Sequence, residues 1–516
     1  MPIDGMWIIK GKFAADFVSV SAAVTPVLYF RFREGDSLAK DSITAREKDY
    51  SKWYLDIVEA AGLSENSGVK GCMVIKPHGF AIWELIRDAL DERIKATGHV
   101  NAYFPLLIPK SYIMKEAEHV EGFAPELAEV THAGGEKLEE SYYIRPTSET
   151  IIGATMARWV RSWRDLPILL NQWANVMRWE MRTRPFLRTA EFLWQEGHTA
   201  HATDEEAERE TLMVLNDVYA DVVERVMAIP ILKGLKTDKE KFAGAVRTYA
   251  IEAMMQDGKA LQAGTSHNLG QNFAKSFEIK YQTNENTEEF AWTTSWGVST
   301  RLIGALIMCH SDDDGLVLPP AVAPVQVVVI PIYKNDEERA KVAETIDRIT
   351  SDWKGKFRWK LDDRDYENFG FKASEWEVKG VPVRVEIGPK DVEKGSAAVA
   401  RRDRPGKAGK SFVDQEGLTA YIEGLLAEIQ QALYDRAKEF RESHTFDVST
   451  YEEFQEKVQE GFVRAYFDGD RAEEDRIQDE TKATVRCIPF DQPDVEGKCF
   501  LTGRSTKRVC IFARSY

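Results

Sequence analysis

Cysteine is scarce in this sequence of 516 residues. The 5 cysteines are odd in number and lie far apart, from Cys72 to Cys510. Disulfide-stapled secreted folds carry many cysteines at close spacing, so the sequence indicates a reducing compartment. Long apolar runs are missing as well, since no uncharged stretch reaches the roughly 18 apolar residues that a membrane-spanning helix needs.

Several familiar catalytic motifs are also missing. The chain has no P-loop and no glycine-rich dinucleotide fingerprint, and its residue spacing suggests no Ser-His-Asp or Cys-His arrangement. Lys and Arg number 68 against 84 Asp and Glu, which gives a net charge of −16. A chain this acidic is not a general polyanion binder, so any nucleic-acid contact must come from a local basic segment.

The remaining composition is that of a folded globular protein. Hydrophobic residues make up 43% and charged residues 29%, and the length suggests about three domains. Residues 1–40 differ from the rest, because Lys10 and Lys12 precede an apolar stretch there, as they would in an export signal. No small-residue cleavage site follows that stretch. We therefore interpret residues 1–40 as an N-terminal extension of unknown role.

Hydrophobic periodicity predicts the main helices and strands. Before residue 316 we expect helices at 80–95, 204–227 and 300–311, and strands at 100–108, 142–144, 168–180, 186–194, 273–281 and 289–294. A proline-rich linker, 316–324, follows. Beyond it, strands at 325–332 and 381–387 alternate with helices at 336–352 and 418–442. This alternation predicts a compact α/β domain.

Polar residues occupy positions where strands usually hold apolar ones. Met177-Arg-Trp-Glu180 alternates so that Arg178 and Glu180 share one face of a strand, and Arg145-Pro-Thr-Ser-Glu149 follows another strand. Unpaired buried charge is costly, whereas guanidinium groups on a sheet suit phosphate and carboxylate ligands. The pattern favours a site for an anionic ligand; the alternative is an exposed sheet face covered by salt bridges.

These segments, in order with Gly264-Thr-Ser-His267 and Gly297-Val-Ser-Thr-Arg301, resemble the prolyl-tRNA synthetases of archaeal/eukaryotic type. That family belongs to the class II aminoacyl-tRNA synthetases. Helix 80–95 with Pro105-Leu-Leu looks like motif 1, the dimer-interface element, while Arg178 to Glu196 looks like motif 2 and Gly297 to Arg301 like motif 3. The segments Arg145 to Glu149 and Phe192 to His201 point to proline as the amino acid.

The resemblance runs from about residue 43 to the end and implies an α+β fold. A class II catalytic domain on an antiparallel sheet would cover residues 41–315. An α/β anticodon-binding domain would follow at 325–430, and a small α+β C-terminal domain at 443–516.

The resemblance also implies an activity, that of a cytoplasmic homodimer which joins L-proline to tRNA(Pro) through a prolyl-adenylate made with ATP. Attack of a carboxylate on the α-phosphorus needs positioning and charge neutralisation, with Mg²⁺ on the phosphates. Arg178 matches the arginine that bridges the α-phosphate and the proline carboxylate, and Arg301 matches the motif 3 arginine. These two are the expected catalytic residues. The other expected ATP contacts are Glu180, Arg188, Thr189, Gln262, Thr265 and Ser299.

Proline itself is a secondary ammonium with two N–H donors and an apolar ring. Glu149 and Thr147 match the acceptors for those donors, and His267 matches a further proline contact. The neighbours of the ring would be Phe192, Trp194 and His198. An alternative role for His198, in a metal cluster with His201 and Asp204, has no second histidine pair to support it.

Two features of related enzymes are missing from this sequence. Residues 202–296 are already used by predicted helix and strands, which leaves no room for an editing insert between motifs 2 and 3. A proline pocket cannot exclude the smaller alanine by size, so a separate hydrolase would have to clear Ala-tRNA. Cys499-Phe-Leu-Thr-Gly503 stands where zinc-binding relatives carry Cys-x-x-Cys-Gly. We therefore expect no zinc.

A basic segment lies in the expected anticodon-binding domain. Val399–Lys410 carries five basic residues and Asp403, a local charge of +4, which predicts contact with RNA phosphates; a solvated charged surface is the alternative. The ending Phe512-Ala-Arg-Ser-Tyr516 resembles relatives whose last tyrosine folds back toward the catalytic domain. Rival functions are an adenylating paralogue, which would lack the anticodon-binding domain, and an inactive tRNA binder, which would have lost residues such as Arg178 or Glu149.

Overall fold

The structure is a computed structural model that describes residues 42–117 and 127–516. The interpretation of residues 1–40 therefore lies outside the described residues. None of the described helices is long and apolar enough to cross a membrane.

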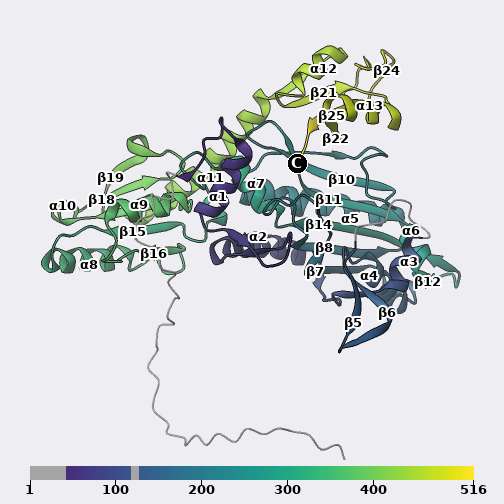
Figure 1. Cartoon of the computed structure of the whole chain (residues 1–516), viewed down its shortest axis with the longest axis horizontal. Helices are drawn as coiled ribbons and strands as arrows, with labels where there is room; N and C mark the ends of the chain where they lie inside the picture. The colour runs from purple at the N-terminus through teal and green to yellow at the C-terminus, as the bar shows by residue number, and fades with distance from the viewer. Residues whose placement is uncertain (1–41, 118–126) are drawn as a thin grey trace, which may run out of the picture. The chain divides into compact units, whose positions relative to one another are not determined.

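One sheet of 11 strands organises most of the chain (Figure 1). In sheet order its strands are β20 (Thr445–Asp447), β21 (Phe462–Tyr466), β25 (Val509–Arg514), β22 (Ala483–Pro489), β9 (Ile231–Leu235), β10 (Arg247–Met254), β11 (Ala260–Gly270), β14 (Trp292–Ser299), β8 (Glu191–His201), β7 (Ile168–Met177) and β3 (Val100–Asn101). All neighbours are antiparallel except the end pairs β20–β21 and β3–β7. The pairing of β22 with β9 makes the last strands of the chain continuous with the central ones.

Helices cover one face of the central strands and form the largest core. They are α1 (Tyr50–Ala60), α2 (Pro77–Ala96), α5 (Asp204–Met213) with its π-helical continuations η3 (Val214–Ala220) and η4 (Val222–Val226), and α7 (Arg301–His310). In α2 the buried residues Ile82, Ile86, Leu90 and Ile94 recur every four positions, which places them on one face. The Thr203 hydroxyl accepts the Glu206 N–H and starts α5, as the capping pattern predicts.

Smaller elements flank the other side of the central strands. A three-stranded sheet contains β4 (Leu107–Pro109), β6 (Glu136–Ile144) and β5 (Glu129–Ala133). It accompanies α3 (Lys110–Ala117), α4 (Glu149–Trp159) and α6 (Asn272–Phe277), and the pair β12 (Lys280–Gln282) with β13 (Glu288–Phe290) completes this part. The pair β1 (Ser64–Asn66) with β2 (Met73–Ile75) belongs instead to the helical side, where Met73 and Ile75 pack against the core.

A second, five-stranded sheet follows. Its order is β16 (Trp359–Leu361), β15 (Val327–Pro331), β17 (Val383–Ile387), β18 (Ser396–Arg401) and β19 (Lys410–Asp414). Val327 and Val329 pack with α8 (Asp336–Thr350) and α11 (Leu418–Ser443). Val328 and Ile330 pack on the opposite face with α9 (Phe369–Val378). The short α10 (Pro389–Lys394) and η6 (Gly406–Gly409) lie in its loops.

The C-terminal segment has its own aromatic core around Phe454, Phe500 and Phe512. Helices α12 (Tyr451–Lys457) and α13 (Arg471–Thr481), with the pair β23 (Gly497–Lys498) and β24 (Ser505–Thr506), complete it.

Some sequence predictions were wrong in detail. The segment 273–281 begins as helix α6, because Phe273, Ala274 and Phe277 are buried at helical spacing. The segment 186–190 is a loop, since Phe186 adopts a φ of 59° that a strand does not allow. The linker 316–324 is a packed connector that contains the helical turn η5 (Pro320–Val322) and buries Leu318 and Val322.

Candidate active site

The face of the central sheet opposite the helical core carries many of the predicted site residues. Residues directly opposite on paired strands point to the same side of a sheet. One row across four strands contains Glu196, Gly297, Thr265 and Ala250, and the next contains His198, Ser295, His267 and Thr248. A third row adds Trp194 opposite Ser299, and Gln262 opposite Glu252. The strand register thus brings together residues more than 60 positions apart in the chain.

Arg178 lies just beyond the end of β7, so the prediction that it belongs to an alternating strand with Glu180 was wrong. Its N–H donates to the Ala190 carbonyl over 2.8 Å, which closes the loop between β7 and β8. Its Nε donates to the Pro146 carbonyl over 2.9 Å, and its guanidinium lies over the rings of Phe192 and Trp194. Burial lowers the pKa of Arg178, and the charges of Glu149 and Glu196 oppose that shift.

Glu149 and Thr147 lie at the start of α4, beside this arginine. The Thr147 hydroxyl donates to a Glu149 carboxylate oxygen, and both side chains are almost entirely buried. Arg145, in the same segment, has a structural role instead. It donates to the backbone carbonyls of Asn175 and Phe104, each over 2.7 Å, and so joins the loop to the sheet.

A buried carboxylate at the centre of the face, Glu196, was not among the predicted site residues. It accepts hydrogen bonds from Ser148 Oγ at 2.5 Å and Gln172 Nε2 at 2.8 Å, and its Oε2 lies 3.0 Å from His198 Nε2. Burial opposes its charge, but the hydrogen bond and charge of His198, with the other two donors, lower the pKa of Glu196 below its ordinary value. The available signal was Gln172, which together with Asn171 and Asn175 places polar side chains in a strand that is otherwise apolar.

The same contact acts on His198. Burial alone would lower its pKa, but the hydrogen bond and charge of Glu196, together with the charge of Glu149, raise it. His267 behaves in the opposite way, because burial and the nearby charge of His198 lower its pKa to about 3. The two histidines of this face are therefore shifted in opposite directions, with the pKa of His198 raised and that of His267 lowered.

The predicted nucleotide residues gather around Arg301, at the start of α7. Its Nε donates to the Leu187 carbonyl over 3.2 Å, and its N–H donates to Ser299 Oγ over 3.2 Å. Burial lowers the pKa of Arg301, and the charges of Arg188 and Arg178 lower it further. Three guanidinium groups thus share one region, as a polyanionic ligand would require.

The other predicted nucleotide contacts differ in their surroundings. Arg188 Nε lies 3.5 Å from a Glu180 oxygen, so these two side chains face each other across the loop. The Thr189 hydroxyl donates to the Glu191 carbonyl over 2.7 Å. Gln262 and Thr265 lie on the sheet face, partly exposed.

The metal alternative at His198 is not supported. His198 and His201 are three positions apart on β8 and therefore point to opposite faces. His201 bonds Thr199 Oγ1 at 2.7 Å on the helical side. Among the described residues, no group of three His, Cys, Asp or Glu side chains is placed to hold a metal ion.

The basic residues of the five-stranded sheet are less available for contact with RNA phosphates than the composition of the segment suggests. Arg402 is buried and donates twice to Asp312, at 2.6 and 2.7 Å. Arg401 pairs with Asp403 at 2.7 Å and Lys410 with Glu386 at 2.6 Å. Most of the positive charge predicted for this segment is therefore neutralised by ion pairs within the fold.

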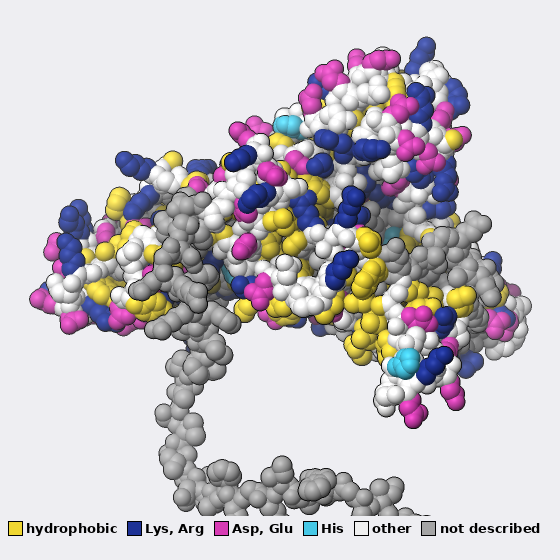
Figure 2. Space-filling model, in the orientation of Figure 1, with side chains coloured by type: hydrophobic (Ala, Val, Ile, Leu, Met, Phe, Trp, Pro, Cys, Tyr) yellow, Lys and Arg dark blue, Asp and Glu magenta, His cyan; other side chains and the backbone are white. Residues whose placement is uncertain are grey.

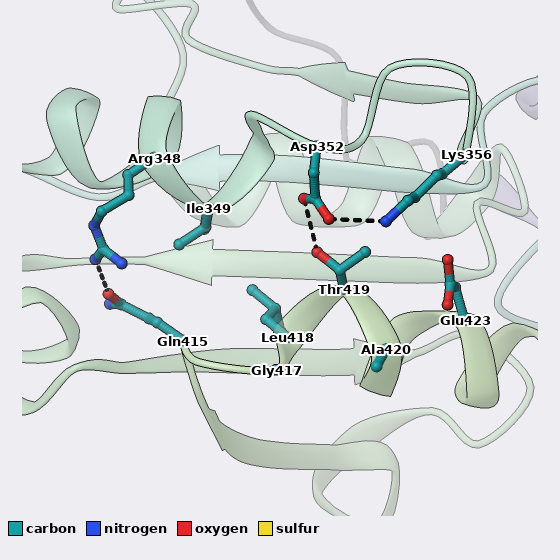
Figure 3. A pocket seen from close by; sticks show the side chains of 10 residues that line it. All are labelled: Arg348, Ile349, Asp352, Lys356, Gln415, Gly417, Leu418, Thr419, Ala420 and Glu423. Atoms are coloured by element: carbon teal, nitrogen blue, oxygen red, sulfur yellow. Dashed lines mark hydrogen bonds and ion pairs between the residues drawn. The ribbon is translucent and has the colours of Figure 1, made fainter.

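A cavity of about 350 Å³ opens between α8 and the start of α11 (Figure 3). Asp352 accepts from Lys356 Nζ at 2.9 Å and from Thr419 Oγ1 at 3.0 Å, and Arg348 donates to Gln415. Asp352 and Lys356 thus neutralise each other, and none of the lining residues belongs to the predicted active site.

The last residue of the chain folds back onto the central sheet, as predicted. The N–H of Tyr516 donates to the Ala260 carbonyl over 3.1 Å, and its hydroxyl donates to Asp257. Arg184, from the loop between β7 and β8, lies over the Tyr516 ring at 5.6 Å. The loop that carries the site arginines is thereby in contact with the C-terminus.

The geometry and the sequence comparisons together define the class of this protein. The family model described as the tRNA synthetase class II core domain (G, H, P, S and T) matches residues 130–310, and the anticodon binding domain matches residues 326–423. The chain thus has the core and anticodon-binding domains of a class II aminoacyl-tRNA synthetase.

The model for the prolyl-tRNA synthetase C-terminal domain matches residues 451–516. The chain is 68% identical to the proline–tRNA ligase of Roseiflexus castenholzii over 93% of its own length and 100% of the relative. It is 55% identical to that of Chlorobaculum tepidum, over 92% and 100%. A crystal structure of prolyl-tRNA synthetase from Cryptosporidium parvum, complexed with halofuginone and AMPPNP, superposes with a TM-score of 0.87 at 40% identity, over 92% of this chain and 99% of that one. The chain therefore belongs to the prolyl-tRNA synthetases, enzymes that ligate proline to tRNA.

Proposed function

We propose that the sheet face described above makes prolyl-adenylate from L-proline and ATP and then passes the prolyl group to the 3′ end of tRNA(Pro). The observation that carries this proposal is the gathering of Arg178, Arg301 and Glu149 at one site, where their charges act on one another or on shared neighbours. Residues 41–315 would be the catalytic domain, 325–430 the anticodon-binding domain and 443–516 the C-terminal domain.

Arg178 holds both reactants of the first step. Its guanidinium binds the proline carboxylate and the α-phosphate, so that the carboxylate oxygen attacks phosphorus in line with the departing pyrophosphate. Placing the reacting groups and neutralising their charge accounts for most of the rate enhancement in such reactions. Arg301 and Arg188 bind the outer phosphates. Glu180, Thr189, Gln262, Thr265 and Ser299 complete the nucleotide site.

The proline ring is recognised by aromatic contact and its ammonium by acceptors. Phe192, Trp194 and His198 border the ring, while Glu149, Thr147 and His267 lie near the ammonium group. His198 is paired with Glu196, and the Glu149 carboxylate, which accepts from the Thr147 hydroxyl through one oxygen, would use its other oxygen for the substrate ammonium.

Magnesium would accompany ATP at this site and neutralise the phosphate charge. Mg²⁺ in such sites is coordinated by one or two carboxylates, by substrate phosphates and by water. The described residues contain no cluster of three possible ligands, which fits an ion held chiefly by the phosphates.

We further propose that the enzyme is of the archaeal/eukaryotic type and does not edit. Strands β9–β14 and helix α6 occupy the chain between motifs 2 and 3, which supports the absence of an inserted editing domain. Clearing of Ala-tRNA would fall to a separate hydrolase. Hydrolysis of Ala-tRNA(Pro) by this chain alone would refute this proposal.

Zinc is not part of the proposal. Structural zinc sites use closely spaced cysteine pairs, and Cys487, Cys499 and Cys510 do not supply such a pair. Metal analysis that finds one zinc per purified chain would overturn this point.

We propose a cytoplasmic homodimer. Large apolar side chains are exposed around β3 and β4, among them Val100 at 59% and Tyr103 at 72%. Figure 2 shows hydrophobic side chains gathered near β5 and β6, beside this region. The strand β3 also ends the central sheet, so its outer edge pairs with no other described strand.

The decisive experiment is proline-dependent exchange of pyrophosphate into ATP, with alanine and cysteine as competing amino acids. We expect exchange with proline at the lowest substrate concentration, followed by charging of tRNA(Pro). An adenylating paralogue would exchange but fail to charge tRNA(Pro), and an inactive tRNA binder would do neither.

A further inference from the structure

A buried ion triad joins the C-terminal segment to the catalytic sheet. Glu252 on β10 is fully buried. Its Oε1 accepts from Lys236 Nζ at 2.7 Å, and Arg486 Nη2 donates to both of its oxygens at 3.0 and 3.1 Å. Lys236 follows β9 in the catalytic sheet, whereas Arg486 belongs to β22 near the end of the chain.

The triad lies on the face of the sheet that carries the nucleotide residues. Glu252 pairs with Gln262 across β10 and β11, next to a register shift between Ile251 and Glu252. Because paired residues share a face, Glu252 lies beside Gln262. Because β22 pairs with β9, which is the neighbour of β10, Arg486 on β22 lies close to Glu252.

The triad contains two cations and one carboxylate, so its net charge is +1. The side chains of Lys236 and Arg486 are only 2% and 7% exposed. A buried charge acts over a longer range than an exposed one, because water does not screen it. The charges of Glu252 and Arg486 both act on Arg301, which places the triad within electrostatic reach of the phosphate-binding arginines.

We propose that Arg486 is a positioning residue of the nucleotide site, through which the C-terminal domain supplies a buried positive charge that favours binding of ATP and pyrophosphate. The donors of Arg486 are occupied by Glu252 and by Thr484 Oγ1, at 3.0 Å. Arg486 therefore acts through the fixed carboxylate and the net charge of the triad, without touching the nucleotide. The inference rests on the proposed use of ATP at this face.

The test compares full-length variants in proline-dependent pyrophosphate exchange. Arg486→Gln reduces the net charge of the triad from +1 to 0 while Lys236 still pairs with Glu252. We expect the KM for ATP and for pyrophosphate to rise about fivefold or more, with the KM for proline unchanged. Arg486→Lys keeps the charge and should stay close to the wild-type values.

A double variant separates charge from packing. Glu252→Gln with Arg486→Gln leaves Lys236 as the only charge and restores the net +1. We expect it to recover most of the lost affinity for ATP. The matched control is Arg508→Gln, because the guanidinium of Arg508 donates to the carbonyls of Phe467 and Gly469 within the C-terminal domain.

Three results would overturn the inference: an unchanged KM for ATP in Arg486→Gln, a double variant as weak as the single one, or an equal rise in the KM for proline. If Arg486→Gln does not fold, Lys236→Gln takes its place, because it also lowers the net charge of the triad from +1 to 0 while Arg486 still pairs with Glu252. An unchanged KM for ATP in Lys236→Gln overturns the inference in the same way. If the wild-type chain shows no proline-dependent exchange of pyrophosphate into ATP, the proposed function itself is refuted.

Discussion

Glu196 and His198 face the same side of β8, and Glu196 Oε2 lies 3.0 Å from His198 Nε2 in the protein interior. Each side chain favours the charged form of the other, so the pKa of Glu196 is lowered and that of His198 is raised. This pair lies next to the carboxylate proposed to bind the proline ammonium. Its protonation state therefore bears on both stability and substrate binding.

The pair predicts a pH-dependent contribution to stability. A raised histidine pKa stabilises the fold fully below the ordinary value of 6.5, and this contribution is lost as the pH rises through the raised value. We expect His198→Gln to lower the free energy of unfolding by about 1–3 kcal/mol near pH 6, and by less near pH 9. Urea unfolding at both pH values checks this expectation. An equal loss at both would contradict it, and the exposed His132→Gln serves as the control.

Arg178 should be indispensable for adenylation but not for folding. The Arg178 residue is exposed, and its guanidinium donates to the Pro146 carbonyl through Nε, so Arg178→Ala leaves few buried polar groups without a hydrogen-bond partner. We expect pyrophosphate exchange to fall by about a thousandfold or more. Arg178→Lys should be nearly as poor, since an ammonium cannot hold two ligands in a planar fork. The exposed Arg164→Ala should retain full exchange; retained exchange in Arg178→Ala would mean that the site lies elsewhere.

Gly197 should tolerate no side chain. It lies between Glu196 and His198, and a Cβ there would meet the Trp296 ring at 2.1 Å. We expect Gly197→Ala to destabilise the fold by about 1–3 kcal/mol, because the buried Trp296 must move. Thermal unfolding measures this loss. Gly424→Ala, in the middle of α11 with nothing within 4 Å, should instead stabilise slightly; similar effects of the two substitutions would refute the packing argument.

The proposed dimer should depend on the exposed apolar residues near β3 and β4. We expect Tyr103→Asp with Leu107→Asp to shift the mass measured by light scattering from dimer to monomer at micromolar concentration, because charge is costly in an apolar interface. Phe412→Asp, an equally exposed aromatic on β19 at 72%, should leave the mass unchanged. A double variant that stays dimeric would place the interface elsewhere.

The sequence by itself determined the long helices and the order of the chemical segments. The stripe of α2, the capped start of α5 and the strand–helix alternation after residue 325 follow from local periodicity, and the structure confirms them. The motif residues around Arg178 and Arg301 could also be identified from the sequence, because charged side chains are unusual within apolar segments.

Only the tertiary structure decided what those charges contact. The register of β8, β14, β11 and β10 places His198 in one row with His267 and Glu252 beside Gln262, and register depends on pairing between strands far apart in the chain. Arg402 looked like an RNA contact in the sequence and is instead bound to Asp312. Long-range pairing of strands and ions leaves no local signature, so no window of sequence could have revealed the triad that joins Arg486 to the catalytic sheet.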